Sequence, residues 1–174
     1  MADQTSISEQ SRDEFAMGLA LQQAEKARLA GEVPVGAVIM QGGEWVASGY
    51  NCPISSNDPT AHAEIVALRA AASKLGNYRL PDCELFVTLE PCAMCAMALL
   101  HARIKRVVFA ATDPKTGVAG SVFDLFALPQ LNHHTCVQGG LLAEASTQML
   151  QDFFAERRKV ARLRKAGLPS AQDA

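Results

Sequence analysis

Short apolar runs alternate with longer segments of mixed polarity along the chain, and this pattern predicts strands and helices in turn. Ser11 and Glu14 have the spacing of a capping box, and Gly31 is a suitable residue for a helix end. The Gly-Gly pair at 42–43 is typical of a tight hairpin, and Asp-Pro-Thr at 58–60 is typical of a helix start. The expected elements are a helix from Ser11 through Arg28, strands at 35–40 and 44–50, a helix from about His62 to Lys74, a strand at 84–89, a helix from Pro91 to about His101, a strand at 104–110, a weaker segment around Val137 and a helix at about 141–165.

The order of these elements indicates an α/β layered fold. The two strands joined by the glycine pair are expected to be antiparallel. The strand at 84–89, the helix after it and the strand at 104–110 follow in quick succession, and such units join parallel strands. The sheet is therefore expected to be antiparallel in its first part and parallel in its second.

Length and composition predict one compact domain. The chain has 174 residues, of which 49% are hydrophobic and 20% charged, and its polar ends at about 1–10 and 168–174 are expected to be frayed. Residues 92–100 form an apolar run far shorter than the roughly 18 residues that a membrane span needs. The polar N-terminus has no apolar segment behind a basic start, so we expect a cytoplasmic protein without a membrane partner.

Charge is distributed unevenly, although the net charge is only −2. Six of the 16 basic residues lie within 157–165, a segment without any acidic residue. A helix end stabilised by cations near its C-terminus has this composition. A phosphate-binding tail has it as well, and both interpretations stay open at this point.

His62, Cys92 and Cys95 are candidate ligands of one Zn²⁺ per chain. An odd count of five cysteines without a secretory signal favours reduced thiols and metal binding over disulfides. Zinc prefers nitrogen and sulfur donors, and catalytic sites commonly use three protein ligands and keep the fourth position for water. In a helix opened by Pro91, the two cysteines share one face, and the positive helix N-terminus favours both thiolates.

Glu64 is the candidate proton carrier for such a water molecule, which needs a nearby carboxylate to take its proton onward. In the middle of a helix, His62 and Glu64 would point about 200° apart, because a turn takes about 3.6 residues. We therefore expect His62 in the first turn, where a side chain leans over the helix end. The helix-start signals at 58–60 agree with that position.

A Cys-x-x-Cys pair on its own also fits a redox pair or half of a structural zinc site. A structural site needs a fourth ligand, and the remaining candidates, which are His101, His133, His134 or another cysteine, lack a paired spacing. The conjunction of His-x-Glu with Pro-Cys-x-x-Cys, in contrast, is the signature of zinc-dependent nucleobase deaminases.

With these motifs the chain resembles the cytidine deaminase superfamily, and within it is similar to the bacterial tRNA-specific adenosine deaminases. The resemblance covers nearly everything from about Phe15 to Arg164. It is carried by EVPVGAV (32–38), GYNCPI (49–54), NDPTAHAEI (57–65), NYRL (77–80), VTLEPCAMC (87–95), RIKRVVFAATDPKTG (103–117) and DFFAERR (152–158). It implies a three-layer sandwich with a central mixed five-stranded sheet, and a homodimer.

The resemblance also implies an activity, the hydrolytic deamination of the wobble adenosine in a tRNA anticodon loop to inosine, with release of ammonia. A water molecule activated by zinc would attack C6 of the flipped-out adenine. Glu64 would take the proton of that water, deliver it to ring N1 and then assist the departure of the amine.

Further residues are assigned to substrate binding by the same resemblance: Asn51, the backbone amide of Ala63, Asp113, Lys115, Thr116, Phe153, Phe154, Arg157 and Arg158. Ordinary structural roles compete with these assignments, since Asn51 also fits a turn and the two phenylalanines also fit a core. Two positions depart from the family. Met97 stands where glycine is common, which bears on packing or a subunit contact, and Ala155 stands where a basic residue is frequent.

Two other functions share parts of this signature. A small-molecule deaminase acting on guanine, cytosine or a nucleoside would have the same zinc motifs, and the basic segment 157–165 and the DPKTG loop favour RNA over it. A non-catalytic, zinc-stapled nucleic-acid-binding module is disfavoured by Glu64, because a structural site needs no such carboxylate.

Overall fold

The computed structural model describes residues 8–166. Its elements are α1 (Glu9–Leu29), β1 (Gly36–Gln41), β2 (Glu44–Tyr50), α2 (Pro53–Ser56), α3 (Ala63–Leu75), β3 (Cys83–Leu89), α4 (Ala93–His101), β4 (Arg106–Ala111), β5 (Cys136–Gly139) and α5 (Ala143–Lys165). Each predicted helix and strand is present close to its expected position, whereas the short α2 was not predicted. No described helix is both long enough and apolar enough to cross a membrane.

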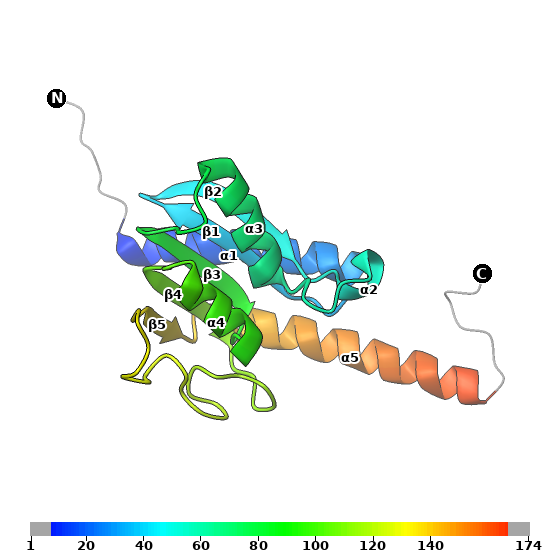
Figure 1. Ribbon diagram of the computed structural model, residues 1–174. Coiled ribbons are helices and arrows are strands. Elements are labelled where there is room, and N and C mark those ends of the chain that lie inside the picture. The colour runs from blue at the N-terminus through cyan, green and yellow to red at the C-terminus, as the bar shows by residue number, and fades with distance from the viewer. Residues whose placement is uncertain (1–7, 167–174) are drawn as a thin grey trace.

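The strands form one five-stranded sheet in the order β2-β1-β3-β4-β5. Strand β1 is antiparallel to both β2 and β3, whereas β3, β4 and β5 run parallel to one another. Helices α3 and α4 cover one face of the sheet, and α1 lies behind the other (Figure 1). The expected three-layer α/β sandwich with a mixed sheet is confirmed.

Alternate residues of the central strands supply two hydrophobic cores, one on each face of the sheet. Under α1 lie Val38, Met40, Phe86 and Val108. Under α3 and α4 lie Ile39, Leu85, Val87 and Val107. Burial on both faces explains why these strands appear in the sequence as continuous apolar runs.

Glycines bring two helices into direct contact with the sheet. A Cβ atom at Gly36 would lie 2.1 Å from the carbonyl oxygen of Ala20 in α1, and one at Gly49 would lie 2.5 Å from that of Ala63 in α3. A side chain at Gly49 would push the first turn of α3 away from β2. This glycine therefore helps to position the start of α3, where the candidate site begins.

The start of α1 differs from the expectation. Ser8, not Ser11, is the N-cap, and its hydroxyl oxygen accepts a hydrogen bond of 3.2 Å from the amide of Ser11. The predicted capping box at Ser11 is therefore wrong, and residues 9–10, which were expected in a frayed end, are helical. The rest of the expected frayed ends, 1–7 and 168–174, lies outside the described residues.

Arg106 joins several elements at the end of the sheet where β3 and β4 begin. Its guanidinium group lies 2.6 Å from Asp13 of α1 and 2.9 Å from Glu84 of β3, and it donates a 2.8 Å hydrogen bond to Gln138 of β5. The Arg106 side chain is only 10% exposed. Through these contacts, the buried guanidinium group of Arg106 holds α1 against the sheet.

We predict that Arg106→Ala lowers the free energy of unfolding by about 3 kcal/mol, because it leaves two carboxylates facing each other without their cation. Urea denaturation measures this change. The matched control is Arg69→Ala, since the Arg69 side chain is 63% exposed in its ion pair with Asp58 and its removal should change little. Equal losses in the two variants would contradict the role given to Arg106.

Candidate active site

The candidate site lies where helices α3 and α4 begin. His62 is the N-cap of α3 and Cys92 is the N-cap of α4, and both have extended backbone conformations. His62 therefore lies just before the helix, where it leans over the end, as the His-x-Glu spacing requires. Asp58, which was expected to cap this helix, instead accepts a 2.8 Å hydrogen bond from the amide of Thr60 in a preceding turn.

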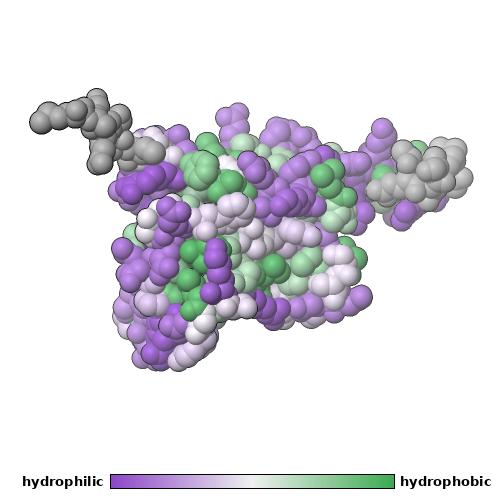
Figure 2. Space-filling model, turned by 90° about the horizontal axis from the view of Figure 1, so that it is seen from above, coloured by the Kyte–Doolittle hydropathy of each residue, from purple (hydrophilic) through white to green (hydrophobic). Residues whose placement is uncertain are grey.

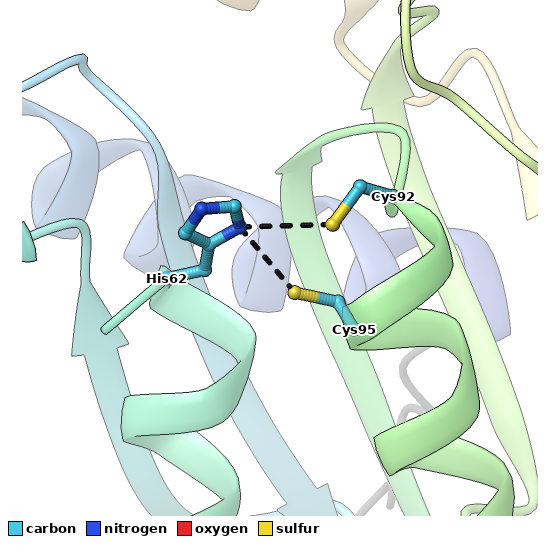
Figure 3. Close-up of side chains that lie close together, drawn as sticks. All are labelled: His62, Cys92 and Cys95. Carbon is cyan, nitrogen blue, oxygen red and sulfur yellow. Dashed lines mark hydrogen bonds between the residues drawn. The ribbon is translucent and has the colours of Figure 1, made fainter. Parts of the chain in front are cut away.

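Three donor atoms converge between the two helix ends, as Figure 3 shows. His62 Nδ1 lies 3.7 Å from Cys92 Sγ and 3.6 Å from Cys95 Sγ. In a tetrahedral zinc site with ordinary bond lengths, a nitrogen and a sulfur ligand are about 3.6 Å apart. The spacing and the donor types therefore fit zinc, and within residues 8–166 no other group of histidine, cysteine or acidic residues meets in this way.

The pKa values of the two thiols of the cluster shift in opposite directions. The hydrogen bond from the Cys95 thiol lowers the pKa of Cys92 to about 4. The same bond, together with burial, raises the pKa of Cys95. The hydrogen bond with Cys92 also raises the pKa of His62. Metal binding therefore has to release protons from this cluster.

Glu64 lies beside the cluster without belonging to it. It is the second residue of α3, is only 4% exposed, and is absent from the group of converging donor atoms. Burial raises the pKa of Glu64 to about 7, and the nearby charge of Cys92 adds to the rise. Such a carboxyl group is held out of water at the site and can take up or release a proton there.

Asn51 and Ala63, two predicted substrate contacts, are brought together by the fold. The side-chain oxygen of Asn51 accepts a 3.0 Å hydrogen bond from the backbone amide of Ala63. Because an amide N–H requires an acceptor, this bond fixes the orientation of the Asn51 side chain. The N–H of Ala63 is thereby used within the protein, and the NH₂ group of Asn51 remains as a donor.

The loop at 112–121 is shaped by Asp113. Its carboxylate accepts hydrogen bonds of 2.9 Å from the amide of Lys115 and 2.6 Å from the hydroxyl of Thr116. Of the three residues predicted here, Asp113 and Thr116 therefore hold the loop in shape. The side chain of Lys115 is exposed and makes no ion pair with a residue in 8–166.

Glu90, a further buried carboxylate near the site, was missed by the sequence analysis. It is 2% exposed and accepts hydrogen bonds from the same loop. Burial alone would raise the pKa of Glu90, but the hydrogen bonds from Ser121 and from three backbone amides bring it below its ordinary value. The sequence signal that could have identified Glu90 is its position, since it is an acidic residue between an apolar strand and Pro91.

The predicted residues of α5 separate into buried and exposed ones. Phe153 is 6% exposed and belongs to the interior, whereas Phe154 is 44% exposed, with its ring centre 5.4 Å from that of Phe153. Arg157 lies over the Phe153 ring at 5.6 Å, and both Arg157 and Arg158 are exposed. Beyond them α5 projects away from the sheet (Figure 1).

The two departures from the family pattern have different surroundings. Met97 of α4 is half-buried and packs against the core on the α3 side. Ala155 is exposed on α5. Neither residue lies in the cluster of His62, Cys92 and Cys95.

Comparison with known proteins agrees with this site. Residues 10–111 match the cytidine and deoxycytidylate deaminase zinc-binding region. A tRNA-specific adenosine deaminase of Haemophilus influenzae is 49% identical over 92% of this chain and 94% of its own length. The chain belongs to the tRNA-specific adenosine deaminases. The member of this family from Bacillus subtilis is 42% identical over 86% of this chain and 92% of its own.

Comparison with solved structures agrees with this family assignment. A structure from a study of A-to-I editing by tRNA:A34 deaminases at the wobble position of transfer RNA has a TM-score of 0.76 and 43% identity, over 78% of this chain and 99% of its own. A guanine deaminase of Nitrosomonas europaea has a TM-score of 0.69 and 26% identity, over 82% of this chain and 84% of its own. The tRNA-specific adenosine deaminase fold and its zinc centre thus account for the motifs found in the sequence.

Proposed function

We propose that this chain, as a single deaminase domain spanning 1–174, converts the wobble adenosine of a tRNA anticodon loop to inosine. The reaction consumes one water and releases one ammonia. The observation that carries the proposal is the three-donor cluster with a buried, non-coordinating carboxylate beside it. The identity of 49% to a tRNA-specific adenosine deaminase supports the choice of substrate.

His62, Cys92 and Cys95 are proposed to hold one zinc ion per chain. Three protein donors are the usual number in catalytic zinc sites. When bound, zinc supplies the Lewis acid that makes a water molecule acidic enough to act as a nucleophile near neutral pH. The positive ends of α3 and α4 face the cluster and favour its thiolates.

Glu64 is proposed to move the protons of the reaction. It takes one proton from the attacking water and passes it to N1 of the adenine. It then takes the remaining proton from the hydroxyl group now on C6 and delivers it to the amino group, which leaves as ammonia while C6 becomes a carbonyl. Its burial keeps the carboxylate out of bulk water, so that its proton exchange is with the substrate. Asn51 is proposed to donate from its NH₂ group to the target nucleoside, in the orientation that the amide of Ala63 fixes.

The RNA surface is proposed to combine the loop at 112–121 with α5. Lys115 offers an exposed charge, and Asp113 and Thr116 hold the loop around it. Arg157 and Arg158 contact phosphates, and the exposed ring of Phe154 stacks on a base, while Phe153 supports it from the interior.

We predict that Arg157→Gln combined with Arg158→Gln weakens binding of an anticodon stem-loop. The slope of log affinity against log salt concentration should become shallower by about 0.7 to 0.9 for each phosphate that these arginines neutralise. Titrations at several salt concentrations measure both. The control is Lys105→Gln, which removes an exposed cation directly before β4 and should leave the slope unchanged. An unaltered slope in the double variant would move the phosphate surface elsewhere.

A small-molecule deaminase is the second candidate, and the likeness to a guanine deaminase at 26% identity favours it. Assays of anticodon stem-loop, free adenosine, guanine and cytidine separate the two. Inosine should form in the RNA, with no ammonia from the free compounds. Release of ammonia from guanine alone would favour the second candidate, and no turnover of any substrate would favour a non-catalytic zinc module.

We also propose that the protein acts in the cytoplasm as a homodimer. Val122, Phe123 and Leu128 lie in one segment after the substrate loop and are 53%, 49% and 43% exposed. Separately from this segment, the face of the molecule seen from above in Figure 2 carries hydrophobic patches of its own. Light scattering coupled to chromatography should give twice the 18.6 kDa chain mass, and the chain mass itself would contradict the proposal.

A further inference from the structure

Glu90 occupies an unusual position for a charged residue. It directly follows β3 and stands two residues before Cys92, at the start of the metal-binding helix. Its side chain is 2% exposed, yet it makes no ion pair with any residue in 8–166. A buried carboxylate without a cation has to be stabilised by hydrogen bonds.

Those hydrogen bonds come from the loop at 112–121. One carboxylate oxygen accepts from the amides of Ala119 at 2.8 Å and Ser121 at 3.1 Å. The other accepts from the amide of Asp113 at 2.9 Å and from the hydroxyl of Ser121. The loop is thus wrapped around the carboxylate, and both of its ends are bound to it.

The backbone on either side of Glu90 is paired with the same region. Its amide donates to the carbonyl of Ala111 at 2.8 Å, and the carbonyl of Pro91 accepts from the amide of Val118 at 3.0 Å. Cys92 pairs with Gly117 through an isolated bridge. The segment that leads into the metal-binding helix and the loop therefore form one hydrogen-bonded unit.

Gly117 is needed for this unit because of space. A Cβ atom there would lie 2.4 Å from the carboxyl carbon of Glu90 and 2.6 Å from the carbonyl oxygen of Asp113. No left-handed backbone conformation demands glycine at this position. The glycine of the DPKTG segment thus allows the loop to close on Glu90.

We propose that Glu90 is a positioning residue that fixes the loop at 112–121 to the Cys92 end of α4, and so sets where Lys115 meets the nucleotides beside the target adenosine. The part of this inference that concerns nucleotides rests on the proposed function. Glu90 is not one of the converging donors, and its side-chain hydrogen bonds all go to the loop, so we place its effect on the reaction in the loop.

Glutamine is the sharpest substitution, because it has nearly the same shape. Each carboxylate oxygen accepts from at least one backbone N–H. In Glu90→Gln one of those oxygens becomes an NH₂ group, whichever way the amide turns. At least one backbone donor then faces another donor, and one end of the loop is released.

Hydrogen exchange tests the inference without any substrate. In Glu90→Gln, exchange at the amides of Asp113, Ala119 or Ser121 should accelerate by about tenfold or more, the change expected for losing a hydrogen bond to a charged group. Zinc should stay at about one per chain. With the stem-loop RNA, KM should rise by about tenfold and kcat should change less than about twofold, because the loop binds neighbouring nucleotides.

Glu84→Gln is the matched control, since Glu84 lies at the opposite end of β3 and pairs with Arg106. It should not accelerate exchange in the loop, even though it removes an ion pair. Unchanged exchange in Glu90→Gln, or a loss of zinc and kcat with KM unaltered, would overturn the inference. If the wild-type protein deaminated no RNA, the proposed function would fail, while the exchange experiment would still decide the role of Glu90.

Gly117→Ala provides a second variant if Glu90→Gln fails to fold. Its added methyl group should displace the carboxylate and accelerate exchange at the same amides. In a Glu90→Ala background only the approach to the Asp113 carbonyl oxygen remains, so Gly117→Ala should accelerate that exchange less than it does in the wild-type background. Independent, additive effects of the two substitutions would show that Glu90 and Gly117 are not coupled and would contradict the proposal.

Discussion

Glu64→Gln should reduce ammonia release from an anticodon stem-loop by a factor of at least about 10² to 10⁴, the usual contribution of a positioned acid–base group. Glutamine keeps the shape of the side chain but neither accepts nor returns the proton. Glu64 is 4% exposed, so bulk water does not replace it as a proton carrier. Inosine formation and ammonia release under single-turnover conditions measure the loss.

Zinc content distinguishes this role from metal binding. Glu64 is not among the three converging donors, so Glu64→Gln and Glu64→Ala should both keep about one zinc per chain. Glu84→Gln, a carboxylate change at the far end of the sheet, should keep both zinc and turnover. Undiminished turnover in Glu64→Gln would refute the proton transfer assigned to this residue.

Cys95→Ala is expected to have the second large effect, a loss of both zinc and activity. The variant leaves two donors of the cluster, too few for the three-ligand site. The thermal midpoint of the wild-type protein should rise on adding zinc to the metal-free form, because a ligand at about a thousandfold its Kd stabilises the folded state by about 4 kcal/mol. That rise should be absent in Cys95→Ala.

Cys136→Ala controls for the removal of a cysteine as such. Cys136 is exposed in β5 and lies outside the cluster, so this variant should bind zinc and show the same thermal shift as the wild type. Full zinc occupancy in Cys95→Ala, or its loss in Cys136→Ala, would contradict the ligand set. Calorimetry measures the thermal midpoint, and metal analysis of the same samples measures the zinc content.

Much of the fold was predictable because its signals are local. The continuous apolar runs of the central strands, the Gly-Gly hairpin and the short strand-helix-strand unit each depend on neighbouring residues alone. The start of α1 was mispredicted for a related reason. Ser8 and Ser11 are both good cap residues, and a polar segment offers no apolar pattern to choose between them.

The residues of the zinc cluster could also be predicted from the sequence. Cys92 and Cys95 lie together because of their spacing, and the Glu64 position follows from the placing of His62 at a helix end. The spacing does not predict that α3 approaches α4, because this depends on how both helices pack on the sheet, where Gly49 lets α3 lie close to β2.

The amino-acid sequence by itself determined the order of the helices and strands and the pairing of Cys92 with Cys95, because each depends on residues within a turn or two of one another. The conjunction of the distant His-x-Glu and Pro-Cys-x-x-Cys motifs added His62 and Glu64 to the predicted site. The tertiary structure decided which acids are buried, that Phe153 is interior while Phe154 is exposed, that Asn51 is oriented by Ala63, and that Glu90 binds the loop at 112–121. These features depend on contacts with residues distant in the chain, and burial and hydrogen bonding of that kind arise only when the layers pack.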